Sequence, residues 1–172
     1  MRDEPKKKEI EMTKANDFLK LISSGETLIL DAVDGTETLY GASDVFAYRD
    51  SNFKNYGVNE KELATGKIPV DMHEMIKDAI FAQMFGSLSS DVKKLCLTQH
   101  QIKNFVKKYR NWLRDDGYAT FFLFESNNEL FVAHVYFDSD GGLKVLVRRF
   151  EYSLVWRVGL CHRLVVPQLA AA

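Results

Sequence analysis

The sequence has 172 residues, of which 46% are hydrophobic and 27% are charged, and its formal net charge is −1. A chain of this length can bury roughly two thirds of its unfolded surface, so its core needs no disulfide or metal. The composition excludes an intrinsically disordered chain, and the near-neutral charge is not typical of a dedicated nucleic-acid-binding protein.

The apolar runs are short, and the N-terminal stretch is charged. TLILDAV and FFLF fall well below the ~20 residues that a membrane span needs. MRDEPKKKEIEM carries charges where a signal peptide would be apolar. We therefore expect a cytoplasmic protein that does not span a membrane. Cys96 and Cys161 are the two cysteines, and without a secretion signal we expect both to be reduced and buried.

Residues 1–12 alternate basic and acidic side chains and predict a flexible N-terminal tail. We expect a single domain over residues 13–169, followed by a possible vector-derived tail, Ala170–Ala172. Apolar residues from position 15 to 22 recur at helical spacing after Thr13, which predicts a helix that ends at Gly25. TLILDAV predicts a strand, and DGTETLY predicts a turn and a second strand.

The middle of the chain is the least regular part. Residues 41–69 mix aromatic residues with turn formers, and we expect short strands and a long surface loop that reaches Pro69. The next stretch, DMHEMIKDAIFAQMF, predicts a helix over residues 71–85. Asp71 and Glu74 have the spacing of a capping box at its start, and Gly86 would end it.

The C-terminal half has clearer patterns. Thr98 and Gln101 predict a capping box for a helix over residues 99–114, whose apolar side chains form one stripe. YATFFLFE, ELFVAHVYF and GLKVLVRRF follow as three strands joined by tight turns. RLVVP predicts a fourth strand that ends at Pro167. Together these elements predict an α+β fold, an antiparallel β-meander packed on one face by two or three amphipathic helices.

Several of these segments also resemble a family of uncharacterised bacterial proteins of unknown function. The resemblance is carried by LCLTQHQIKNFVKKYRNWLRDDGYATFFLF, FVAHVYF and HRLVVPQL, and it extends to TLILDAVDGTETLYGASDVFAY. It implies a recurring bacterial domain. It supplies no activity, ligand or catalytic residue.

The helix over residues 99–114 has a row of cations on the side away from its apolar stripe. Residues 1–90 carry 11 basic and 16 acidic residues, a balance of −5, whereas residues 91–172 carry 12 and 8, a balance of +4. A basic row about 16 Å long can follow a phosphate backbone. The alternative is an ordinary solvated helix face. The candidate nucleic-acid-binding residues are Lys103, Lys107, Arg110 and Arg114, with Arg148 and Arg149 from the following strands.

Other chemically active residues have simpler interpretations. Cys96 and His100, with Cys161 and His162, lack the spacing of a zinc site, and we expect core packing. His134 lies in a strand that is apolar on both sides, and we expect it to be a hydrogen-bonded residue of the core rather than a base. The acidic pairs at positions 31/34 and 115/116, and the hairpin DSDGG, are explained as turns. The aromatic residues of the three strands are expected to form the core.

No catalytic constellation can be identified, so the sequence favours a small non-enzymatic binding module that engages a protein partner or itself. We expect no catalytic residue, cofactor or metal. Nucleic-acid binding through the basic helix face is the first alternative. The second is an enzyme of unrecognised type that uses His134, His100 or an acidic cluster near residues 41–69.

Overall fold

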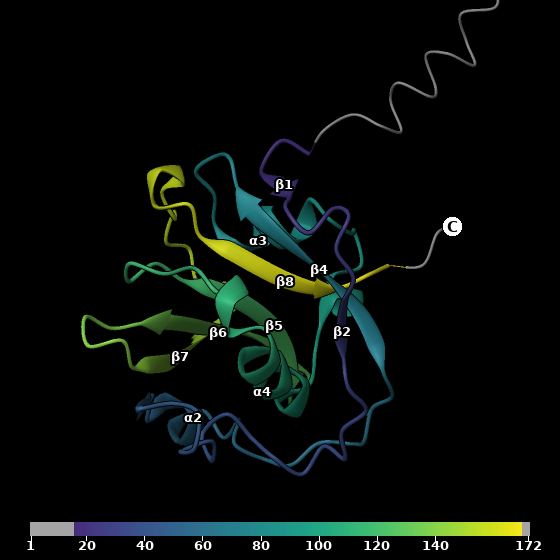
Figure 1. Ribbon diagram of the computed structural model, residues 1–172, viewed down its shortest axis with the longest axis vertical. Helices are drawn as coiled ribbons and strands as arrows, with labels where there is room; N and C mark the ends of the chain where they lie inside the picture. The colour runs from purple at the N-terminus through teal and green to yellow at the C-terminus, as the bar shows by residue number, and fades with distance from the viewer. Residues whose placement is uncertain (1–15, 170–172) are drawn as a thin grey trace, which may run out of the picture.

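The computed structural model describes residues 16–169, which form one mixed eight-stranded sheet (Figure 1). The strands lie in the order β1–β4–β8–β5–β6–β7–β3, and β2 also pairs with β4. Their bounds are β1 Leu19–Leu21, β2 Leu28–Leu30, β3 Tyr48–Arg49, β4 Ile68–Met75, β5 Thr120–Ser126, β6 Glu129–Phe137, β7 Leu143–Arg149 and β8 Arg163–Pro167. The helices are α2 Asn52–Asn55, α3 Phe81–Gly86 and α4 Gln99–Lys108. The fold is therefore α+β, but richer in strands than the predicted meander.

The predicted meander is confirmed. β5, β6 and β7 pair antiparallel in sequence order, and Asn127 and Asn128 form the first turn with positive φ angles. β8 also forms and ends at Pro167 as predicted. It lies between β4 and β5, however, antiparallel to the former and parallel to the latter.

The two faces of β5 contribute to different parts of the core. Phe122 and Phe124 pack in one cluster with the α4 residue Phe105, whereas Phe121 packs in a second cluster with the α3 residue Phe81. The two helices therefore cover opposite faces of the sheet, with α4 in front in Figure 1. The prediction that the helices share one face is wrong, because a strand that is apolar on both sides needs a cover on each.

The predicted helix over residues 71–85 is also wrong in its first half. Residues Ile68–Met75 form β4, which pairs with β8 on one side and with β1 and β2 on the other. Met72 and Met75 would share one helix face, but in the strand they belong to the two different core clusters. Glu74 does not cap a helix, since it pairs with Arg163 across the sheet at 3.2 Å. Only residues Phe81–Gly86 are helical.

Two further predictions in the N-terminal part are wrong. From residue 16 on, the predicted helix is replaced by a turn and β1. The Asn16 side chain accepts hydrogen bonds from the backbone N–H groups of Phe18 and Leu19, and Leu19 then pairs with Met75. TLILDAV does contain a strand, β2, but DGTETLY contains none. In residues 41–69 the short strand β3 and the unpredicted helix α2 lie beside β7 (Figure 1).

α4 begins with the predicted capping box, since Thr98 accepts from the Gln101 backbone and Gln101 binds the Thr98 N–H. The α-helix ends at Lys108, six residues before the predicted end, and a single 3-10 turn, Arg110–Trp112, follows. The Tyr109 hydroxyl binds the backbone of Ile29 at this point. The chain therefore leaves the helical path where β2 passes beside it.

Within residues 16–169, no helix has both the length and the apolar character needed to cross a membrane. The predicted flexible tail, Thr13 at the start of the predicted first helix and the possible vector-derived Ala170–Ala172 lie outside the described residues.

Candidate functional site

The first residue of the predicted basic row, Lys103, is buried, with 6% of its surface exposed. Its ammonium group pairs with Glu37 and with Asp44, the latter at 3.0 Å. Although burial lowers the pKa of Lys103, the bonds to the two carboxylates outweigh it and raise the pKa above its usual value. His100 bonds to the same loop, accepting at Nδ1 from the Gly35 N–H. These contacts bind the loop after β2 to α4 and leave no cation there for a ligand.

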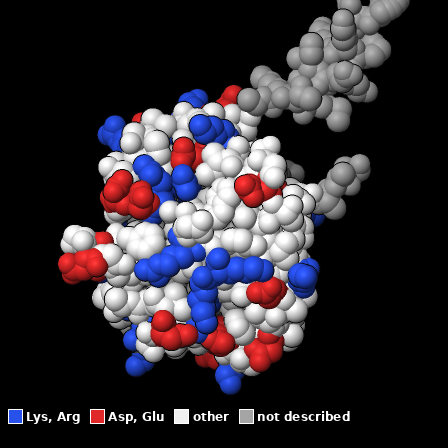
Figure 2. Space-filling model, viewed as in Figure 1, with Lys and Arg blue, Asp and Glu red and all other residues white. Residues whose placement is uncertain are grey.

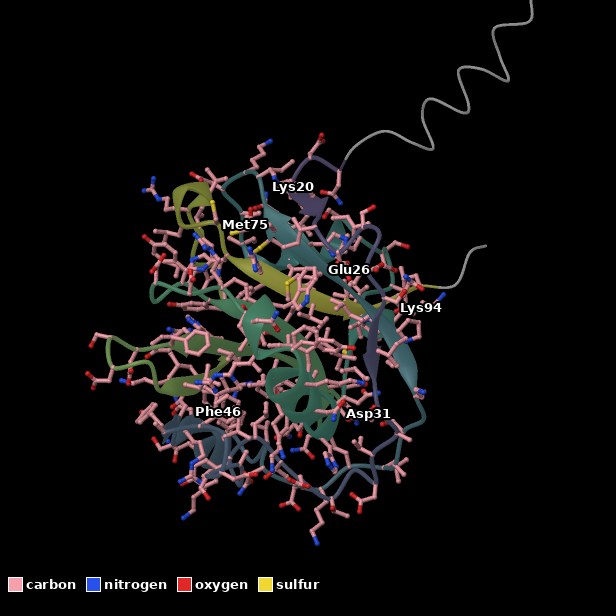
Figure 3. The ribbon with its side chains drawn as sticks, in the orientation of Figure 1. Lys20, Glu26, Asp31, Phe46, Met75 and Lys94 are labelled. Carbon is pink, nitrogen blue, oxygen red and sulfur yellow. The ribbon has the colours of Figure 1, made fainter. Side chains whose placement is uncertain are left out.

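The rest of the row is divided by the early end of α4. Lys107 and Arg110 are exposed, and Arg110 lies over the ring of Phe137 at 5.0 Å. Arg114 is half-buried and pairs with Asp115. Lys108 binds Asp31, which lies beside α4 in Figure 3. Figure 2 shows a band of basic side chains over α4 with acidic side chains beside it.

Arg148 and Arg149 do not join this band as one patch, because neighbouring residues of a strand point to opposite faces. Arg149 lies over Tyr56 and Phe131, on the face that α4 covers. Arg148 lies over Tyr152 on the other face. Both arginines line one cavity of about 310 Å³ at the end of β7. Its walls also include Asn52, Tyr56, Val147, Glu151, Tyr152 and Ser153.

The segment that follows β7 exposes three large apolar side chains within four residues. Tyr152, Leu154 and Val155 are 37%, 44% and 49% exposed. We call residues 150–157 the apolar loop. Exposed apolar residues that occur singly are ordinary, whereas three within four residues form a candidate contact surface.

The apolar loop is held at both of its ends. The Phe150 N–H donates to the Leu130 carbonyl, and the backbones of Trp156 and Ala79 exchange two hydrogen bonds of 2.8 and 3.1 Å. The Val158 N–H donates to the Asp78 carboxylate. The exposed apolar residues therefore sit on a segment whose ends are fixed, which limits the entropy lost when a partner binds.

Trp156 fills the space between the apolar loop and the sheet. Its ring lies 4.9 Å from Phe121, 5.4 Å from Phe81, 5.4 Å from His134 and 5.3 Å from His162. Trp156 therefore anchors the loop within the α3 side of the core.

The two histidines of this cluster are buried, with exposed fractions of 9% and 4%. Burial, followed by the nearby Arg148 guanidinium, lowers the pKa of His134 to about 3. Burial lowers the pKa of His162 to about 4. Both rings are neutral near pH 7. His134 lies in the core as predicted, but its Nδ1 has no hydrogen-bond partner among the described residues.

Several nitrogens of the cluster lack partners within the described part of the chain. His162 Nδ1 accepts from the Ala119 N–H, so its proton is on Nε2, which is buried and unpaired. His134 Nδ1, Trp156 Nε1 and Arg148 Nε are also buried without a partner. Buried polar atoms are seldom left unpaired. This cluster thus differs from the loop after β2, where Lys103 is paired with the carboxylates of Glu37 and Asp44.

Both cysteines are free and half-buried rather than fully buried. Burial, together with the Glu125 carboxylate, raises the pKa of the Cys96 thiol to about 12, so it is a poor nucleophile. Among residues 16–169, no group of three or more His, Cys, Asp or Glu side chains is placed to hold a metal ion.

The acidic turn residues Asp115, Asp116 and Asp138 line a cavity of about 680 Å³. Asp138 accepts from the backbone N–H groups of Asp140 and Gly142, which is ordinary turn chemistry. Asp34 likewise accepts from Thr36. The interpretation as turn formers is confirmed for Asp34 and Asp138, but Asp31 instead binds Asn104 and Lys108 of α4.

No model of a protein family, no curated protein and no solved structure matches the chain. The resemblance to uncharacterised bacterial proteins stays a prediction.

The sequence interpretation named Arg148 and Arg149 but did not identify the apolar loop. Its signal is the segment EYSLVW, which has large apolar residues without the spacing of a helix or the alternation of a strand. Such a run between two strands can be core or surface. The structure shows which residues of the segment are core and which are surface: Trp156 is buried under the loop, whereas Tyr152, Leu154 and Val155 are exposed.

Proposed function

We propose that the protein is a non-enzymatic binding module whose partner protein contacts the apolar loop. The observation that supports this most strongly is the exposure of Tyr152, Leu154 and Val155 on a segment fixed at both ends. Exposing apolar side chains to water is unfavourable. The same segment buries Trp156, yet it leaves Tyr152, Leu154 and Val155 exposed. A rigid apolar surface beside a polar rim is the usual form of a protein-binding site.

Site-specific photo-crosslinking in expressing cells tests this proposal. We expect benzoylphenylalanine at position 154 to yield one discrete product with a partner chain. Leu63 is the matched control, since it is 85% exposed but has no exposed large apolar neighbour in sequence. A product of twice the mass of the chain identifies self-association through the same surface. Equal, diffuse labelling at positions 154 and 63 contradicts the proposal.

Nucleic-acid binding is the second candidate, and the basic band over α4 favours it (Figure 2). Within the described residues, Lys107 and Arg110 have no carboxylate within 4.0 Å, so their charges are available to phosphates. We expect labelled oligonucleotides to bind with an affinity that falls log-linearly with salt, and Lys107→Glu with Arg110→Glu to remove binding. Lys103 is left unchanged in this variant because it is buried and paired with Glu37 and Asp44. Absence of binding at low salt rejects this candidate.

A further inference from the structure

The cavity of about 310 Å³ adjoins the apolar loop, since Tyr152 and Ser153 line it and Leu154 follows directly. Consecutive Cα atoms are about 3.8 Å apart. A partner segment that contacts Leu154 and Val155 therefore reaches the cavity within a few of its own residues. The chemistry of the cavity walls then determines which side chain the partner places there.

The walls of the cavity are rich in hydrogen-bond donors. The Arg148 guanidinium lies 5.0 Å from the centre of the Tyr152 ring, and Arg149 lies 4.6 Å from that of Tyr56. Stacking on an aromatic ring fixes the plane of a guanidinium and leaves its N–H edge for a planar oxyanion. Arg148 Nε is buried without a partner.

The charges that line the cavity limit the ligand to a single negative charge. Arg149 already contacts both carboxylate oxygens of Glu129 at 3.3 Å. Arg148 has no carboxylate within 4.0 Å among residues 16–169. Glu151 also lines the cavity. One uncompensated cation beside an acidic wall suits a carboxylate better than a phosphate, which carries a charge of about −1.5 to −2.

We propose that the partner is an acidic–apolar peptide segment whose Asp or Glu carboxylate is bound by Arg148 in this cavity while its apolar residues cover Leu154 and Val155. This inference rests on the proposed function and adds the chemistry of the partner. The carboxylate accepts two hydrogen bonds from the edge of the Arg148 fork, and Tyr152 separates this pair from the apolar contacts.

Selection from a random peptide library displayed on phage, with the full chain as bait, tests the inference. We expect the wild type to enrich peptides that carry Asp or Glu beside apolar residues. Arg148→Gln should weaken a selected peptide about 10- to 100-fold. Arg148→Lys keeps the charge but not the fork and should weaken it to a similar degree. Replacing the acidic residue of the peptide by its amide should have the same effect.

The outcomes separate the inference from the proposed function. Peptides that depend on Leu154 and Val155, but lack an acidic residue or bind Arg148→Gln equally well, overturn the inference alone. Tighter binding of a phosphoserine peptide overturns the carboxylate assignment. If Leu154→Ser with Val155→Ser enriches the same peptides as the wild type, both the inference and the proposed function are wrong. Unfolding curves of each variant confirm that it is folded.

Discussion

Two regions on opposite faces of the sheet, the loop after β2 and the cluster around Trp156, differ in how their polar groups are matched. On the α4 side, Lys103, His100 and their carboxylate partners bind the loop after β2 to the helix. On the α3 side, His134, His162 and Trp156 have buried nitrogens without partners, and the apolar loop above them exposes hydrophobic side chains. The paired charges stabilise the position of the loop after β2, whereas the nitrogens around Trp156 are buried without a hydrogen-bond partner among the described residues. In this molecule the basic helix identified from sequence is thus partly structural.

The largest expected difference in the free energy of unfolding is within the apolar loop, between variants of its buried anchor, Trp156, and variants of its exposed residues. Trp156→Ala removes a ring packed among four others and should lower the free energy of unfolding by about 3–5 kcal/mol. Leu154→Ala, two residues away, should change it by less than about 0.5 kcal/mol because Leu154 is exposed. Urea denaturation measures both. Equal losses would show that the loop is uniformly buried.

On the α4 side, a glycine fixes the loop. Gly35 has φ +81°, and an added Cβ would lie 2.3 Å from the Leu63 carbonyl oxygen. Gly35→Ala should therefore lower the free energy of unfolding by about 3 kcal/mol. Gly57 is the control, since its φ is +69° but nothing lies within 4 Å of its Cβ position; Gly57→Ala should cost about 1 kcal/mol. If thermal or urea unfolding shows no difference, the close approach of the loop at Gly35 is wrong.

A smaller effect distinguishes structural from free cations on α4. Lys103→Ala leaves the Glu37 and Asp44 carboxylates without their cation and should cost about 2 kcal/mol, because these carboxylates are partly hydrated. Lys107→Ala should change the free energy of unfolding by less than about 0.5 kcal/mol, since Lys107 is exposed. Chemical denaturation at low and high salt compares them. If Lys103→Ala leaves the free energy of unfolding unchanged, Lys103 is a solvated surface residue like Lys107.

The buried histidines make the α3 side sensitive to acid. Their folded pKa values of about 3 and about 4 lie below the unfolded value of 6.5. Between these pH values the unfolded chain binds more protons, so stability is full above about pH 6.5 and falls as the pH is lowered through the folded pKa values. Each histidine should contribute a slope of up to about 1.4 kcal/mol per pH unit.

Two variants separate the contributions of the two rings. His134→Phe should flatten the slope between pH 6.5 and 5 and cost little at pH 7, since aromatic rings surround it. His162→Phe should flatten the slope as well, but at pH 7 it leaves the Ala119 N–H unpaired and should cost about 1–3 kcal/mol. Unfolding measured across the pH range gives both values. An unchanged slope in both variants would exclude buried neutral histidines.

The sequence predicted those elements whose signals are local. The Thr98 capping box, the meander and the end of β8 at Pro167 depend on neighbouring residues, and all three are present. β4 was predicted as a helix because Met72, Met75, Ala79 and Ile80 also fit helical spacing. Its strand partners, β8 and β1, are about 90 and 50 residues away in the chain, so no local pattern reveals them.

Only part of the candidate site could be predicted from the sequence. Arg148 and Arg149 were identified by their charge. That they line one cavity together with Tyr56, which follows α2, depends on packing between segments far apart in the chain. The burial of Lys103 could not be predicted either, since its partners come from the irregular loop near residues 37–44. The sequence of a helix therefore predicts which of its residues are charged, but not which of these charges are paired with residues elsewhere in the chain.

The most direct measurement is the affinity of the cross-linked partner, or of a selected peptide, for the wild type and for Leu154→Ser with Val155→Ser. We predict that the double variant binds at least about tenfold more weakly, because two apolar contacts are lost, while its free energy of unfolding stays within about 0.5 kcal/mol of the wild type. An unchanged affinity at unchanged stability would contradict the assignment of the apolar loop as the binding surface.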